Sequence, residues 1–165
     1  MAKNLRYLLF AFLIGAGLAG CSSGSGVVKS TTGPEFSTGD LQGQWTATDI
    51  FFSYSEVDNV PDPDHADIIG DGGSGFMTIE ANGRFILTID PADRDALVVG
   101  GLMFFEDGEY FAIQFDDEPD DYEYFGATLT GNTFSITGGP NTAEYDLDLD
   151  GVGDPCNVSM EFVRL

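Results

Sequence analysis

From Leu41 to the C-terminus, apolar and polar residues alternate with a period of two, which is typical of β-strands with one buried face. The alternation is clearest at Tyr145, Leu147 and Leu149, and again over residues 157–165. Gly and Pro interrupt the pattern often, and no stretch after the first 20 residues has the period of an amphipathic helix. The pattern therefore predicts an all-β domain of short antiparallel strands.

The apolar segments that follow this pattern are separated by turn signals. They span residues 41–55, 75–81, 83–89, 96–106, 109–115, 122–130, 132–137, 142–150 and 157–165. If residues 132–150 form one long strand, kinked at the Gly-Gly-Pro sequence of 138–140, the domain has eight strands. If that sequence is a true turn, the domain has nine strands.

The connections between these strands are of two kinds. Three are tight turns, with the dipeptides Asn82-Gly83, Asp107-Gly108 and Gly131-Asn132. Four are long and acidic, and they span residues 56–74, 90–95, 116–121 and 150–156. The two kinds alternate in an eight-stranded meander, so all four acidic loops lie at one end. With nine strands, the last acidic loop moves to the other end.

Gly43 and Trp45 lie on the first predicted strand, and Arg164 lies at the end of the last. This arrangement, over residues 41–165, resembles the lipocalin-like barrels of small bacterial lipoproteins. The resemblance implies an eight-stranded antiparallel up-and-down barrel, with the tryptophan at its closed end beneath the late arginine. The first and last strands are then neighbours, and a cation over the indole face contributes about 0.5–2 kcal/mol. A second lipocalin signature and a C-terminal helix are not found.

The first residues predict export and lipidation. Lys3 and Arg6 precede an uncharged apolar run over 8–19, which is shorter than the ~20 residues of a spanning helix. The run ends in Leu-Ala-Gly-Cys at Cys21, and this part resembles a bacterial lipoprotein precursor. The resemblance implies several acyl chains on Cys21, which becomes the mature N-terminus and anchors the protein stably. The residue after it is Ser22 rather than Asp, which favours the outer membrane.

Three segments follow from these features. Residues 1–20 are predicted to be a cleaved signal peptide, and residues 41–165 the barrel domain. Residues 21–40 are rich in Ser, Gly and Thr and are interpreted as the lipidated cysteine with a flexible tether. The alternative is that this stretch forms an irregular first layer of the domain.

Charge narrows the range of partners. The chain has 28 acidic and 6 basic residues, and removing the signal leaves four bases and a formal charge of −24. Such a charge argues against nucleic acid and against an anionic membrane surface, and it favours cations or simply high solubility. Apart from the lipid anchor in the membrane, the expected partner is a small molecule.

An eight-stranded barrel either fills its interior with side chains or holds one small ligand. The predicted inward residues are Phe76, Phe85, Leu87, Phe111, Ile113 and Phe134. Phe51, Phe52 and Tyr54 precede the longest loop, which resembles an aromatic mouth with a lid. The leading hypothesis is a non-catalytic binding module for a small apolar or cationic ligand. The alternative is a structural or interaction lipoprotein whose acidic loops bind Ca²⁺ or a basic partner.

Catalysis is not expected from this sequence. His65 is the only histidine and lies among acidic residues in a loop. A nucleophilic role for Cys156 would require a base nearby, and the sequence suggests none. With Cys21 lipidated, Cys156 also has no partner for a disulfide.

The segment from Asp146 to Asn157 raises the question of calcium. It matches positions 1, 3, 5, 6 and 9 of an EF-hand loop but has Asn157 in place of the final glutamate, and it also resembles one thrombospondin type 3 repeat. Same-face residues on a strand are ~6.5–7 Å apart, so three aspartates of one straight strand cannot converge on one ion. The strand is expected to stay straight to about residue 148. A Ca²⁺ site would therefore use Asp154, Asp148 or Asp150, and backbone carbonyls of the turn, without Asp146. The alternative is a solvated acidic turn that binds no metal.

Overall fold

The computed structural model describes residues 27–54 and 65–165, and its regular structure is entirely β. The strands are β1 (Lys29–Ser30), β2 (Gly43–Tyr54), β3 (His65–Asp67), β4 (Ser74–Ile79), β5 (Arg84–Asp90), β6 (Leu97–Glu106), β7 (Tyr110–Phe115), β8 (Glu123–Thr130), β9 (Thr133–Tyr145) and β10 (Asp154–Arg164). β1 and β3 are short additions that pair with β6 and β2.

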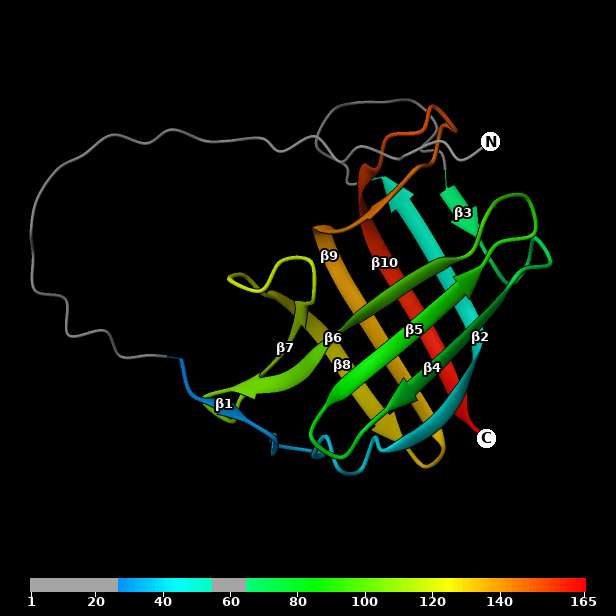
Figure 1. The fold of residues 1–165 in the computed structure, drawn as a ribbon. Helices are drawn as coiled ribbons and strands as arrows, with labels where there is room; N and C mark the ends of the chain where they lie inside the picture. The colour runs from blue at the N-terminus through cyan, green and yellow to red at the C-terminus, as the bar shows by residue number, and fades with distance from the viewer. Residues whose placement is uncertain (1–26, 55–64) are drawn as a thin grey trace, which may run out of the picture.

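The eight longer strands form a closed antiparallel barrel (Figure 1). The ring runs β6-β5-β4-β2-β10-β9-β8-β7 and closes by the pairing of β7 with β6. The first and last barrel strands, β2 and β10, are neighbours over nine residue pairs. The prediction of an eight-stranded, up-and-down, lipocalin-like barrel is therefore confirmed.

β9 decides between eight and nine strands, because it continues through the Gly-Gly-Pro sequence. Cys156 of β10 faces Ala143, whereas Val158 faces Gly138, so residues 139–142 bulge out of the ladder. Thr142 Oγ1 donates a hydrogen bond to the carbonyl oxygen of Gly139 at 2.8 Å within this bulge. The bulge bends the strand without ending it, as bulges commonly do.

The connections are distributed between the two ends of the barrel as the strand order requires (Figure 1). The tight turns β4–β5, β6–β7 and β8–β9 lie at one end, called the closed end below. The loops β5–β6, β7–β8 and β9–β10 lie at the other end, where β2 also finishes; this is the open end. Residues 55–64 of the longest acidic loop lie outside the described residues.

The stretch before Leu41 packs on the barrel, which corrects the prediction of a tether up to residue 40. β1 pairs with Glu106 and Phe105 of β6. Phe36 is only 8% exposed, and its ring centroid lies 5.3 Å from that of Phe105. Thr38 is fully buried and donates a hydrogen bond to the carbonyl oxygen of Ala81 at 3.0 Å. Residues 27–40 therefore cover the closed end of the barrel, in agreement with the alternative that this stretch is an irregular first layer of the domain. Residues 21–26 lie outside the described residues.

One predicted inward residue faces the solvent. Phe76 is 52% exposed, while its neighbours Gly75 and Met77 are buried. Phe76 and Met77 are both apolar, so the sequence does not say which of the two faces the core. The register of β4 with β2 decides which residue faces the core, because it pairs Met77 with Trp45, which is buried in the interior.

Candidate functional site

A cavity of about 450 Å³ lies inside the open half of the barrel. Its wall is mainly apolar and comes from β2 and β4 to β10, with Met77, Phe85, Leu87, Ile89, Met103, Ile113, Phe125, Ile136 and Val158 among the lining residues. Of the residues predicted to point inward, Phe85, Leu87 and Ile113 line this cavity. Phe111 and Phe134 are also buried but lie outside it. The barrel interior is therefore neither wholly filled nor wholly hollow.

Carboxylates surround part of this cavity. The lining includes Asp117, Glu118, Asp121 and Glu123 of the β7–β8 region and Glu144 of β9, but no lysine or arginine. Partial burial raises the pKa of the Glu118 carboxyl above its ordinary 4.5, and the charges of Asp117 and Glu144 add to this effect. The cavity thus joins an apolar interior to a negatively charged rim.

The predicted aromatic mouth is divided by the strand geometry. Phe52 is 3% exposed and lines the cavity, where its ring stacks on Tyr145 at a centroid distance of 4.4 Å. Phe51 points to the other face of β2 and stacks on the ring of His65 at 5.3 Å. Of the lid predicted over 56–74, residues 56–64 lie outside the described residues, and residues 65–67 form β3, which pairs with β2.

His65 and Cys156, the two residues considered for catalysis, differ in their surroundings. His65 is exposed at the start of β3 and contacts Phe51. The Cys156 thiol is fully buried and donates a hydrogen bond to the carbonyl oxygen of Asp154 at 2.9 Å. Burial raises the pKa of this thiol, so it is held in its protonated, poorly nucleophilic form.

At the closed end, the structure brings Trp45 and Arg164 together. The guanidinium carbon of Arg164 lies 4.3 Å from the centroid of the indole ring. The same guanidinium donates hydrogen bonds to the carbonyl oxygens of Gln42, at 2.5 Å, and of Asp40. The indole N–H of Trp45 donates to the carbonyl oxygen of Leu41 at 2.8 Å. Gly43 has a φ of 141° here, and a side chain would contact Arg164.

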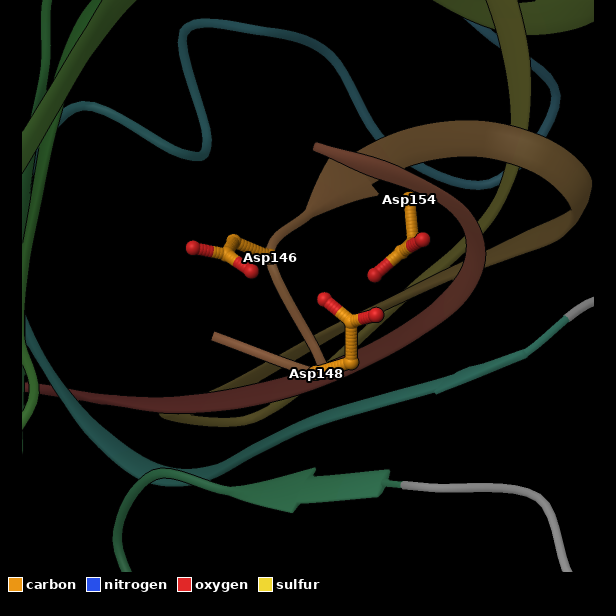
Figure 2. A group of neighbouring side chains, drawn as sticks. All are labelled: Asp146, Asp148 and Asp154. Carbon is orange, nitrogen blue, oxygen red and sulfur yellow. The ribbon is translucent and has the colours of Figure 1, made fainter. Parts of the chain in front are cut away.

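Three aspartates gather in the β9–β10 loop at the open end (Figure 2). One carboxylate oxygen of each of Asp146, Asp148 and Asp154 lies within 4.8 Å of the others. Asp150 is not part of this group; its carboxylate accepts a hydrogen bond from the amide of Val152 at 2.8 Å. The structure therefore places Asp146, which was expected to stand apart, beside Asp148 and Asp154, and leaves Asp150 outside the group.

The difference from the expected position of Asp146 comes from the residue at which β9 ends. β9 stops at Tyr145, so the alternation of Tyr145 with Leu147 and Leu149 does not continue as a straight strand. The Asp146 carboxylate turns back into the loop and accepts hydrogen bonds from the amides of Asp150 and Gly151 at 3.1 and 3.0 Å. Leu149 takes a positive φ of 64° to allow this turn.

Arg94 is a residue of this end that sequence reasoning missed. Its guanidinium donates a hydrogen bond to the carbonyl oxygen of Asp146 at 2.6 Å and lies 4.8 Å from the ring centroid of Tyr145. It thereby joins the β5–β6 and β9–β10 loops. The available signal was that Arg94 is one of only four basic residues after Cys21, in a chain with 28 acidic residues.

Comparisons with models of protein families, with curated proteins and with solved structures give no match to this chain. The described part of the chain contains no helix that is long and apolar enough to cross a membrane. The function proposed below therefore depends on the geometry of the chain itself.

Proposed function

We propose that the protein is a non-catalytic binding module that holds one small amphipathic molecule in its barrel cavity. The observation that carries this proposal is the cavity of about 450 Å³, which is within the usual range for ligand sites of ~300–1,000 Å³. Its apolar wall favours an apolar body, because removing apolar surface from water contributes roughly 25 cal/mol per Å².

The rim favours a cationic group on the same ligand. Five carboxylates border the cavity and no base accompanies them. An ammonium group near Glu118 and Glu144 would be attracted to them and would relieve their mutual repulsion. It would also favour the charged form of Glu118, whose pKa is raised in the free protein.

Displacement of the neutral fluorophore N-phenyl-1-naphthylamine from the purified full chain tests this proposal. Decyltrimethylammonium, decanol and decanoate are the competitors, since they share a chain length and differ in head-group charge. We expect the cation to compete best and the anion worst, with the preference decreasing as salt is added. Failure of the fluorophore and of all three competitors to bind contradicts the proposal.

Two rim variants locate the head group. Glu118→Gln and Glu144→Gln should each weaken binding of the cation several-fold and leave binding of decanol unchanged. Glu80→Gln, in the tight β4–β5 turn at the closed end, is the matched control and should affect neither. As the pH falls through the raised pKa of Glu118, binding of the cation should weaken, because the protonated carboxyl no longer attracts it.

A second function is favoured by the cluster of Asp146, Asp148 and Asp154, whose oxygens approach one another within 4.8 Å. We propose Ca²⁺ as its ligand, since carboxylate and carbonyl oxygens are the groups this ion prefers. Millimolar Ca²⁺ should raise the Tm, and Asp146→Asn should remove most of that rise. Asp150→Asn is the control and should retain it. No change in Tm with Ca²⁺ excludes this role.

We also propose that the protein works as a lipoprotein of the bacterial cell envelope, anchored through Cys21. The support is the sequence Leu-Ala-Gly-Cys at residues 18–21, which follows a basic and then apolar N-terminal segment. Metabolic labelling with a palmitate analogue tests it: the wild-type chain should be labelled and Cys21→Ser should not. The tight-turn end, where the described chain begins, would then face the membrane and leave the cavity mouth accessible.

A further inference from the structure

The seam between β7 and β8 is the weakest pairing in the barrel wall. Only two residue pairs join these strands, Ala112 with Tyr124 and Ile113 with Glu123. From Phe125 to Thr130, β8 is paired with β9 alone among the described strands. β7 begins at Tyr110, so β8 extends past it toward the closed end (Figure 1). Residues 126–130 therefore present a strand edge without a paired neighbour, about 16 Å long at ~3.3 Å per residue.

A groove of about 440 Å³ runs beside this edge. Gly126, Ala127 and Thr128 of β8 line it together with Pro34, Glu35 and Phe36 of the segment before β2. The aromatic rings of Tyr110 and Tyr124 also line it and are 62% and 49% exposed. The free edge is thus accompanied by an accessible aromatic surface, which is distinct from the cavity inside the barrel.

Charged side chains and prolines, two of the usual protections of an edge strand, are missing from residues 126–130. Native proteins blunt exposed edges with charged side chains, prolines or bulges. The sequence from Phe125 to Ala143 contains no charged residue, although 21% of the whole chain is charged, and β8 contains no proline. This edge is therefore free to accept a further strand.

The charges around the groove select the partner. Glu35 and Glu109 line it, and no lysine or arginine does. A second copy of this chain would bring another −22 of formal charge, which opposes pairing of the two copies. A second copy would also have no described base available for Glu35 and Glu109, because all four are engaged in contacts within the barrel: Lys29, Arg84, Arg94 and Arg164.

We propose that the groove binds an extended, basic peptide segment of another protein, which adds to β8 as a further strand. The main chain of the peptide would pair with the edge of residues 126–130, as in known modes of strand addition. Its apolar side chains would contact Tyr110 and Tyr124, and its lysines would approach Glu35 and Glu109.

A seven-residue peptide of alternating valine and threonine, with lysine at each end, is the probe for this proposal. Binding to the full chain is measured by fluorescence anisotropy and by amide hydrogen exchange. We expect saturable binding and slower exchange at residues 126–130. Methylating alternate backbone nitrogens on the pairing edge of the peptide should weaken binding about tenfold or more, since this removes its main-chain donors. Equal binding of the methylated peptide overturns the proposal.

Variants of the chain place the site. Thr128→Lys should weaken peptide binding about tenfold, because it puts a like charge at the groove. Thr78→Lys is the matched control, since Thr78 is exposed but its strand is paired on both sides by Gln44 and Ile86. Glu35→Lys, at another residue that lines the groove, gives an independent variant and should also weaken binding. Equal effects of Thr78→Lys and Thr128→Lys would overturn the assignment.

The identity of the occupant is tested separately by sedimentation of the chain alone. A monomer at all concentrations is expected. A concentration-dependent dimer that Thr128→Lys abolishes would show that a second copy occupies the edge, and would overturn the proposal of a basic peptide.

Discussion

The closed and open ends of the barrel differ in how their interiors are filled. At the closed end, Leu41, Trp45 and Phe134 are fully buried, and the ring of Phe36 packs on Phe134 at 6.2 Å. At the open end, part of the barrel interior is left as a cavity of about 450 Å³. Close packing maximises contacts, whereas a void loses the contacts that would have filled it. The closed end is therefore expected to provide stability, and the open end to provide binding.

Charge separates the two ends further. Arg164 at the closed end is satisfied by the indole ring and by two carbonyl oxygens. At the open end, partial burial raises the pKa of Glu118, and the charges of the surrounding carboxylates raise it further. The charged group at the closed end thus has favourable partners, whereas the carboxylates at the open end repel one another. Such an arrangement is common where a protein binds a ligand.

The largest expected effect is that of Trp45→Ala. Removing this fully buried ring should lower the free energy of unfolding by about 3–5 kcal/mol, because it leaves a void beside Phe134. Urea denaturation followed by circular dichroism measures it. Phe76→Ala is the control, since Phe76 is 52% exposed, and should cost less than about 1 kcal/mol. Similar losses in both variants would contradict the difference in packing.

A smaller effect is expected from Arg164→Leu. This change removes a cation–π contact and two hydrogen bonds to carbonyl oxygens, and should lower the free energy of unfolding by about 1–3 kcal/mol. Arg84→Leu removes only an exposed ion pair with Asp116 and should leave the Tm nearly unchanged, because exposed ion pairs contribute little to stability. The comparison of the two Tm values checks the role of the closed end. If Arg84→Leu is the more damaging, Arg164 does not act as described.

Filling the open end should change binding more than stability. Val99→Phe places a larger apolar side chain on the cavity wall, where space is available, and should change the free energy of unfolding by about 1 kcal/mol or less. Binding of N-phenyl-1-naphthylamine should weaken about tenfold, since the larger side chain occupies part of its volume. Unchanged binding with normal stability would show that the fluorophore binds elsewhere.

The smallest expected effect concerns the pH dependence of Glu118→Gln. The pKa of Glu118 is raised on folding, so its charged form is disfavoured in the folded state. This penalty is present above the raised pKa and disappears as the pH falls below the ordinary value of 4.5. The variant should therefore have a slightly higher Tm than the wild type at pH 7 and the same Tm near pH 3. A lower Tm at pH 7 would mean that the carboxylate is stabilised by a partner.

Much of the fold followed from local patterns. Alternation of period two located the strands, and the Asn-Gly, Asp-Gly and Gly-Asn dipeptides located the three tight turns. These features depend on near neighbours in the chain, which is why one sequence is enough to recognise them. The ring order then follows from short antiparallel connections, and it brings Trp45 of β2 beside Arg164 of β10.

The errors arose where distant contacts override local composition. Residues 27–40 are rich in Ser, Gly and Thr, yet the single ring of Phe36 docks among Phe105, Phe111 and Phe134. Gly33 permits this approach, because a side chain at that position would collide with the ring of Phe105. No local pattern indicates that such a contact is made.

The acidic β9–β10 loop is a second place where the local pattern did not predict the structure. The alternation around Tyr145, Leu147 and Leu149 predicted a straight strand, whereas backbone amides of the loop draw the Asp146 carboxylate inward. Three aspartates therefore meet in a combination that the alternation excluded. A turn signal was present in Gly151, but the residue at which the strand stops depends on pairing with β10.

The sequence by itself indicated the all-β class and the three tight turns and, through its resemblance to lipocalin-like barrels, the meeting of Trp45 with Arg164. The choice between eight and nine strands, which fixes the end at which the last acidic loop lies, was left to the tertiary structure. Only the tertiary structure decided that the closed half of the barrel is filled and the open half hollow, and that the edge of β8 is left unpaired. The reason is physical: alternation specifies which face of a strand is apolar, but the space left between facing side chains depends on the tilt, register and length of strands far apart in the chain.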